Sequence, residues 1–155
     1  MPSRRSNITM TAAEIDAFLD DQRVLNVATI GVTGHPHLVA MWYAVRDGKV
    51  VFWTFAKSQK VLNIRRDPKI TGLVESGDSY SELRGVELVG TARLVEDYDE
   101  ILDIGLRVAA KYQGPAATSD EARPFVEAQA RKRIGIVIDV ERTVSWDHTK
   151  LAGVY

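Results

Sequence analysis

The sequence predicts a mainly β fold of the α+β class, an antiparallel barrel of six or seven strands with flanking helices. Residues 24–56 contain three segments rich in β-branched and aromatic residues, separated by short turns; such segments favour β-strands. Asp47-Gly48 lies between the second and third segments and is typical of a two-residue hairpin. Because hairpins rather than long helical crossovers join most of the strands, a parallel sheet is not expected.

One helix and a three-stranded meander are expected in the first third of the chain. Thr11 and Glu14 have the spacing of a capping box, which predicts a helix over residues 11–22. The strands of the meander are expected at residues 24–32, 37–46 and 49–56. The second and third strands are apolar at consecutive positions, which indicates burial on both faces. The barrel interior would cover one face, and a partner subunit is a candidate cover for the other.

The rest of the chain is expected to add three helices and three or four strands. The helices are expected at residues 58–66, 98–112 and 121–131, and the strands at 69–76, 83–96 and, as one strand or two, 132–146. The apolar side of the first of these helices is expected to consist of Val61, Leu62 and Ile64. Asp67-Pro68 ends that helix. Gly85 and Gly90 predict a bend or a bulge in the longest strand.

Hydrogen-bond donors and positive charges gather where the third strand passes into the next helix. Thr54 and Ser58 supply hydroxyls, and Lys57 and Lys60 supply ammonium groups. The first backbone N–H groups of a helix lack internal partners and carry partial positive charge. Together these groups predict a phosphate-binding site. The alternative is that Ser58 only caps the helix and the lysines only face solvent.

Composition restricts the classes of function. The chain has 20 basic and 21 acidic residues and a net charge of −1, so nucleic acid and anionic membranes are not expected partners. Its 155 residues suit one domain, residues 1–155, of which residues 1–10 are expected to be flexible. The lack of cysteine and of a membrane-length apolar run points to the cytoplasm. His35 and His37 have no third ligand nearby, so no metal site is expected.

The strand-to-helix junction resembles the flavin-phosphate segment of the pyridoxamine 5′-phosphate oxidase-like family. The residues that carry the resemblance are, in order, Thr54, Ser58, Lys60, Asn63 and Asp67-Pro68. Two neighbouring segments also look like the family: G-H-P-H-L-V-A-M-W-Y-A-V-R-D-G-K before the junction, and after it L-R-G-V-E-L-V-G, which contains Arg84. The likeness covers most of residues 11–146. It implies a split β-barrel that binds a flavin or deazaflavin at a homodimer interface.

Two positions depart from the pattern of the family's flavin mononucleotide (FMN) oxidases. Val39 stands where those oxidases carry Arg, and Gly85 stands where they carry Gln. The segment V-E-S-G-D-S-Y-S-E-L-R-G-V-E-L-V-G and the tail S-W-D-H-T-K-L are more similar to the actinobacterial branch that uses coenzyme F420. This cofactor is a deazaflavin with a phosphate and an acidic oligoglutamate tail. The resemblance therefore implies coenzyme F420, with FMN as the alternative cofactor.

The resemblance also implies which residues bind the cofactor: Thr54, Lys57, Ser58, Lys60, Met41, Trp42, Tyr43, Asn63 and Arg84. The backbone amides of Trp42 and Tyr43 are expected to face the cofactor ring, and both side chains equally suit a barrel core. Candidates for contact with the acidic tail, unless they form an ordinary cationic helix end, are Arg65, Arg66 and Lys69. Trp146 and Tyr155 are candidates for a substrate pocket at the interface.

Three functions remain open from the sequence. No set of nucleophile and base stands out, so no catalytic side chain is expected, and a cofactor would supply the bond-making chemistry. The resemblance favours an F420-dependent oxidoreductase that transfers a hydride to an unsaturated small-molecule acceptor. An FMN-dependent oxidoreductase of the same fold and a non-catalytic cofactor-binding protein are the alternatives.

Overall fold

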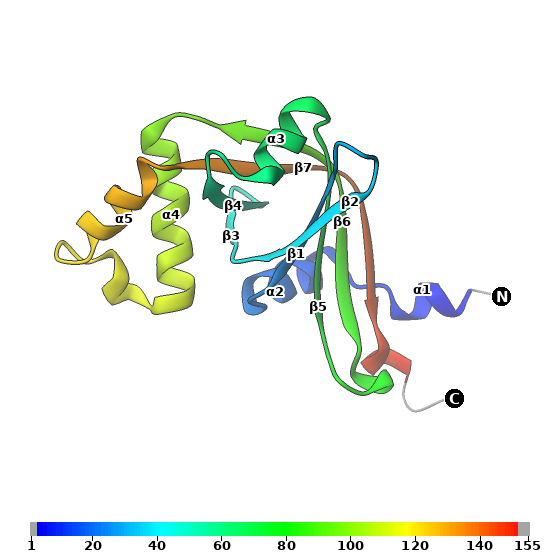
Figure 1. Ribbon diagram of the computed structural model, residues 1–155. Helices are drawn as coiled ribbons and strands as arrows, with labels where there is room; N and C mark the ends of the chain where they lie inside the picture. The colour runs from blue at the N-terminus through cyan, green and yellow to red at the C-terminus, as the bar shows by residue number, and fades with distance from the viewer. Residues whose placement is uncertain (1–2, 152–155) are drawn as a thin grey trace.

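Seven antiparallel strands, all within the residues 3–151 that the computed structural model describes, form one sheet that curls into a half-barrel (Figure 1). The strands are β1 (Leu25–Ile30), β2 (Pro36–Met41), β3 (Ala44–Arg46), β4 (Lys49–Phe55), β5 (Lys69–Ser76), β6 (Arg84–Val95) and β7 (Arg133–Asp147). Their order across the sheet is β2-β1-β5-β6-β7-β4-β3. The predicted fold class, a mainly β antiparallel split barrel with flanking helices, is confirmed.

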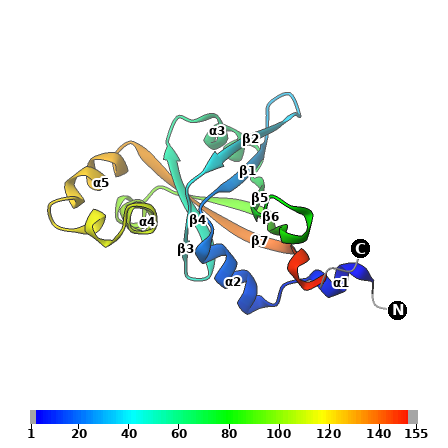
Figure 2. The same ribbon diagram turned by 90° about the horizontal axis from the view of Figure 1, so that it is seen from below.

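Five α-helices flank the sheet in the described part of the chain. They are α1 (Arg4–Ile8), α2 (Ala12–Asp21), α3 (Gln59–Arg66), α4 (Tyr98–Gln113) and α5 (Arg123–Ala130), and short 3-10 helices lie at Tyr80–Glu82, Pro115–Thr118 and His148–Leu151. Helices α4 and α5 lie together near the start of β7, and α1 lies at the opposite end of the molecule, near the end of β7 (Figure 1, Figure 2). The sequence predicted four helices, and α1 is the additional one.

Strand β4 separates two hydrophobic cores. Val50 and Phe52 belong to the core inside the half-barrel, to which α2 and α3 also contribute. Val51 and Trp53 belong to a second core between the outer face of β4 and the helices α4 and α5. Five consecutive residues of β4 are therefore buried, as predicted for a strand that is covered on both faces. The second cover comes from helices of the same chain.

The strand that was expected at residues 37–46 is divided into two. Trp42 and Tyr43 lie between β2 and β3, so β2 pairs with β1 at one edge of the sheet and β3 pairs with β4 at the other. Tyr43 turns into the core, where its hydroxyl is directed at the carbonyl oxygens of Leu19 and Gln22. This anchor on the end of α2 draws the chain out of a regular strand and carries it from one sheet edge to the other.

Two local signals in the first third of the chain are confirmed. Thr11 and Glu14 make both hydrogen bonds of the capping box, and α2 begins at the next residue after Thr11. Asp47 and Gly48 have φ values of +52° and +73°, which a type I′ hairpin requires at both central positions. These short-range patterns depend on a few adjacent residues, so the sequence is sufficient to specify them.

Different structural features explain the two glycines of β6. Gly90 lies at a register shift between β6 and β7, which is the irregularity that was expected there. Gly85 instead lies beneath the Trp146 indole, and a Cβ on it would be 2.1 Å from Trp146 Cζ2. Close packing rather than a bend therefore explains Gly85. Tyr155, the other residue predicted for a substrate pocket beside Trp146, lies outside the described residues.

The buried side of α3 differs from the prediction. Val61 and Ile64 are buried as expected, but Leu62 is 52% exposed. Lys60 and Asn63 are buried instead, because residues three and four apart share one face of a helix. Helix α3 thus turns two polar side chains toward the half-barrel, and these side chains belong to the candidate site described below.

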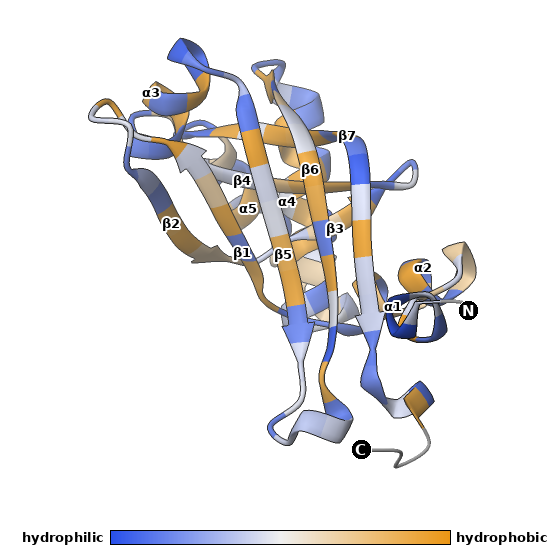
Figure 3. Cartoon of the chain, turned by 90° about the vertical axis from the view of Figure 1, so that its right-hand side faces the viewer, coloured by the Kyte–Doolittle hydropathy of each residue, from blue (hydrophilic) through white to orange (hydrophobic). Residues whose placement is uncertain are grey.

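The long strands show the alternation of a sheet with one face on a core. Buried and less buried residues alternate along most of β5 and along much of β6. Figure 3 shows the corresponding change between apolar and polar colours along these strands. None of the helices in the described part of the chain combines the length and the apolar composition needed to cross a bilayer.

Candidate functional site

The side chains of Thr54, Ser58 and Lys60 come together where β4 passes into α3. Lys60 Nζ donates to Thr54 Oγ1 at 2.9 Å, and Thr54 Oγ1 donates to Ser58 Oγ at 3.4 Å. Thr54 and Lys60 are buried, with 3% and 8% of their surfaces exposed. The structure therefore brings together three of the residues that were predicted to bind the cofactor phosphate.

The alternation of β4 and the direction of side chains on α3 produce this meeting. Thr54 follows Phe52 on the barrel-facing side of β4. Helix α3 begins at Gln59, and a helical side chain leans toward the N-terminus of its own helix. The Lys60 stem therefore runs back along the first turn of α3 toward the end of β4.

The start of α3 presents further donors. Ser58 occupies the N-cap position, but its hydroxyl makes no capping hydrogen bond with any described residue. It accepts from Thr54 instead. The backbone N–H groups of Gln59 and Lys60 have no acceptor within residues 3–151. Because such groups carry the partial positive charge of the helix start, the junction consists of donors and positive charge.

Lys60 is a buried cation that no carboxylate neutralises among the described residues. Burial lowers the pKa of the Lys60 ammonium, and no nearby charge opposes this effect. Burying a charge without a partner costs free energy, and a bound anion would remove that cost. Hydroxyls, amide N–H groups and an ammonium without a carboxylate are the set that suits a phosphate. The residues present at the junction therefore fit the phosphate of a flavin or deazaflavin.

Asn63, another predicted cofactor ligand, holds α3 against β1. It is fully buried, and its Nδ2 donates to Thr29 Oγ1 at 3.1 Å. Its Oδ1 accepts from Gln59 Nε2 at 2.9 Å and from the Arg66 guanidinium at 3.4 Å. These contacts occupy the Asn63 acceptor, so its side chain fixes the helix that carries Lys60.

The other cations near the junction differ in whether their side chains already have partners within the chain. Lys57 is exposed and has no ion pair or hydrogen bond with its side chain among the described residues. The residues predicted for the acidic tail are engaged within the chain: Arg65 pairs with Glu96, Arg66 donates to the Ile30 carbonyl, and Lys69 pairs with Asp67. The three cations are themselves exposed, and contacts of exposed charges contribute little free energy. A strong anion can compete for these cations.

Trp42 and Tyr43 differ in what they offer to a ligand. Tyr43 is fully buried, and its backbone N–H already donates to Tyr112 Oη at 3.0 Å. Trp42 is 52% exposed, and its indole stacks on the Tyr112 ring with the centroids 4.4 Å apart. Met41 packs partly against the core of the half-barrel. Of the three, Trp42 is the residue that presents an aromatic surface.

Arg84 lies far from Thr54 within one chain. Arg84 begins β6 opposite Asp147 at one end of β7, whereas Thr54 is opposite Ile134 at the other end. A strand rises about 3.3 Å per residue, so a single phosphate cannot contact both side chains of one chain. The Arg84 guanidinium lies over the Phe18 ring, with Cζ 5.2 Å from the ring centroid.

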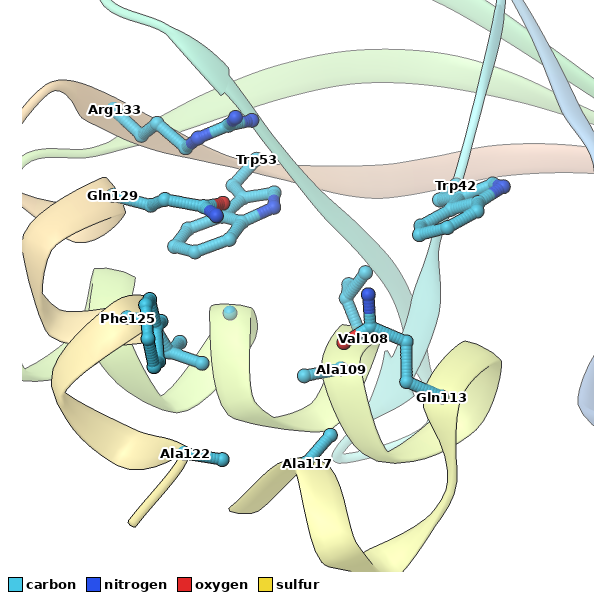
Figure 4. Close-up of a pocket in the computed structure, with 12 residues that line it drawn as sticks. Trp42, Trp53, Val108, Ala109, Gln113, Ala117, Ala122, Phe125, Gln129 and Arg133 are labelled. Carbon is cyan, nitrogen blue, oxygen red and sulfur yellow. The ribbon is translucent and has the colours of Figure 1, made fainter.

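A cavity of about 470 Å³ lies on the opposite face of β4 from Thr54, against α4 and α5 (Figure 4). The residues that line it include Trp42, Trp53, Val108, Phe125, Gln129 and Arg133. Sequence reasoning missed most of this cavity. The sequence pattern that could have indicated it is the aromatic pair Trp53 and Phe55 on one face of a strand. Arg133 joins this pair only because β7 pairs with β4.

Comparison with known proteins places these observations in context. The family model described as pyridoxamine 5′-phosphate oxidase matches residues 11–147. The crystal structure of the conserved hypothetical protein Rv2991 from Mycobacterium tuberculosis is 45% identical, with a TM-score of 0.93 over 99% of this chain and 94% of that chain. A structure named F420 reductase is 25% identical, with a TM-score of 0.64 over 83% of this chain and 94% of that one. The heme storage protein HutZ from Vibrio cholerae shares the fold, at 14% identity and a TM-score of 0.66 over 86% and 93% of the two chains. No protein of curated function matches the sequence.

Proposed function

We propose a function from the premise that the chain belongs to the pyridoxamine 5′-phosphate oxidase family, which includes oxidoreductases and binds flavin-type cofactors. The proposal is that this protein is an oxidoreductase that binds coenzyme F420 and transfers a hydride to an unsaturated small-molecule acceptor. An FMN-dependent oxidoreductase is the second candidate, and a non-catalytic cofactor-binding protein is the third.

The observation that carries the proposal is the buried, unneutralised ammonium of Lys60 beside the hydroxyls of Thr54 and Ser58. In this proposal the three side chains and the free N–H groups at the start of α3 hold the cofactor phosphate, and the exposed Lys57 approaches it from solvent. Each charge-assisted hydrogen bond contributes roughly 1.5–3 kcal/mol. Three or four of them would dominate recognition of a phosphorylated cofactor.

Two positions support coenzyme F420 over FMN. Val39, where the FMN oxidases of the family carry Arg, packs partly against the apolar core of the half-barrel. Gly85, where they carry Gln, is covered by the Trp146 indole, so a longer side chain has no room there. The likeness to a structure named F420 reductase supports the same choice. FMN remains the alternative because the phosphate site alone does not distinguish the two cofactors.

The bound deazaflavin would supply the hydride, and the protein would supply position and shelter. Lys60, Ser58 and Thr54 fix the phosphate, which sets where the attached ring lies. Trp42, held flat by its stack on Tyr112, offers a rigid aromatic surface beside the segment expected to face the ring. Asn63 keeps α3 on β1 and thereby keeps the phosphate donors in place.

We also propose a homodimer with the cofactor at the interface. Within one chain Arg84 of β6 and Thr54 of β4 pair with opposite ends of β7, so both can serve one cofactor only if a second copy contributes one of them. The edge strand β2 also exposes Leu38, which is 66% accessible. Light scattering after size-exclusion chromatography is expected to give the mass of a dimer, and a strict monomer would count against this arrangement.

Cofactor titration tests the central proposal. Purified, cofactor-free protein is titrated separately with coenzyme F420 and with FMN while fluorescence is followed. We expect micromolar binding of coenzyme F420 and binding of FMN that is about tenfold weaker or more, a difference of roughly 1.4 kcal/mol. Micromolar binding of FMN alone would overturn the choice of cofactor. Turnover of reduced F420 with quinones, tetrapyrroles and enones separates a reductase from a non-catalytic binding protein.

A further inference from the structure

Apolar residues form most of the lining of the cavity between β4, α4 and α5. Trp53 forms one wall, and Val108 and Phe125 contribute to the others (Figure 4). Gly105 of α4 allows the Trp53 indole to lie close to the helix, because a Cβ on Gly105 would be 2.3 Å from Trp53 Cζ3. A volume of about 470 Å³ lies within the range of cavities that hold small organic ligands. The volume and the aromatic and apolar lining therefore suit an aromatic molecule.

Arg133 supplies a positive charge at one end of this cavity. Its Cζ lies 4.7 Å from the Trp53 ring centroid and 4.5 Å from the Phe55 ring centroid. Its Nε is buried and has no hydrogen-bond partner among the described residues. Aromatic rings attract the cation through their π faces, but they offer no strong acceptor for the N–H groups in the guanidinium plane.

The described residues around Arg133 supply no anion to its guanidinium. No carboxylate of the described residues forms an ion pair with it, and burial lowers the pKa of the guanidinium without an opposing charge. Gln129 lines the cavity beside Arg133 (Figure 4), and its side chain makes no hydrogen bond with another described residue. A carboxylate can accept two parallel N–H bonds from the terminal nitrogens of the guanidinium, which unlike Nε are not buried.

We propose that this cavity binds a planar aromatic monocarboxylate, with the carboxylate on Arg133 and the ring between Trp53 and Phe125. A carboxylate spreads a single charge over two oxygens and matches the guanidinium fork, whereas a phosphate dianion would cost more to bring into apolar walls. The site goes beyond hydride transfer, and its cation lies apart from the phosphate junction, because the Thr54 side chain that meets Lys60 is on the other face of β4. Trp42 lines the cavity as well.

The test uses 2-naphthoate and its neutral analogue 2-naphthamide as probes of the cofactor-free protein. Calorimetry is expected to show naphthoate binding about tenfold more tightly than the amide. In Arg133→Gln, the affinity for naphthoate is expected to fall about tenfold while that for the amide stays the same. Arg131→Gln is the matched control, because Arg131 is exposed on the adjacent turn, and it should keep both affinities. Lys60→Ala should also keep both, which separates this site from the phosphate junction.

A second variant guards against a loss of folding in Arg133→Gln. Phe125 is 74% exposed, so Phe125→Ala should fold normally, and it is expected to weaken both probes severalfold by removing one wall. Equal affinity for the acid and the amide would overturn the proposal. So would undetectable binding of 2-naphthoate at millimolar concentration, unchanged naphthoate binding in Arg133→Gln, or unchanged binding of both probes in Phe125→Ala.

Discussion

Replacing Lys60 by Met separates an anion-binding role of this side chain from a structural one. Met keeps an unbranched apolar stem of similar length and removes the ammonium. Loss of one charge-assisted bond to the phosphate costs at least about 1.4 kcal/mol, or a tenfold loss of affinity. The cofactor-free protein should respond in the opposite direction, because the ammonium is buried without a carboxylate among the described residues. Its free energy of unfolding is expected to stay the same or rise by about 0–2 kcal/mol.

Two measurements on the same preparations decide the question. Fluorescence titration with coenzyme F420 gives the change in affinity, and urea denaturation without cofactor gives the change in stability. Lys132→Met is the matched control, because Lys132 is exposed in the turn just before β7, and it should alter neither quantity by much. Unchanged cofactor affinity in Lys60→Met would remove Lys60 from the site. A loss of more than about 2 kcal/mol in the free protein would instead make Lys60 a structural residue.

Three other predictions concern stability. Gly85→Gln should lower the free energy of unfolding by about 1–3 kcal/mol, because its Cβ would overlap the Trp146 indole; an unchanged thermal midpoint would contradict this packing. Burial lowers the pKa of Lys111 to about 8 from an ordinary value of 10.5. The unfolded chain binds more protons between these values, so the Lys111 contribution to the free energy of unfolding rises with pH from about 8. Urea denaturation from pH 7.5 to 9.5 should show a smaller rise for Lys111→Met than for the wild type, and parallel curves would refute the assignment. Thr11→Ala should cost about 1 kcal/mol by removing the capping box of α2, and an equal denaturation midpoint would argue against that cap.

The sequence predicts those features that depend on neighbouring residues. The capping box at Thr11 and the hairpin at Asp47-Gly48 need only short-range patterns, and both are found as expected. The meeting of Thr54, Ser58 and Lys60 could also be anticipated, because these residues flank a single strand-to-helix junction. The break at Tyr43 could not, since it depends on a contact of its hydroxyl with the distant end of α2.

The cavity shows the same limit more sharply. Arg133 and Phe55 are far apart in sequence, and they become neighbours only through the pairing of β4 with β7. Neighbouring residues in the sequence do not indicate why position 105 is glycine. The explanation is the Trp53 indole of β4, which packs directly on Gly105. Features that require the pairing of two remote strands, or the docking of a helix on a sheet, are therefore the ones that the sequence left unspecified.

The double burial of β4 connects the two proposed sites. The apolar residues of this strand predicted that both of its faces are covered. The barrel interior was expected to cover one face, and a partner subunit was a candidate cover for the other. Helices α4 and α5 supply that second cover over Val51 and Trp53. The pairing of β4 with β7 places Trp53 and Phe55 against Arg133, while Thr54 on the alternate face meets Lys60. Because successive strand residues point to opposite faces, one strand can position two cations, the buried Lys60 and the half-buried Arg133. Trp42 lines the cavity and is also proposed to lie beside the cofactor ring, so a titration with 2-naphthoate in the presence of saturating coenzyme F420 tests whether the two ligands share this residue: an unchanged naphthoate affinity would show that they do not, and a weakened affinity would show that they do.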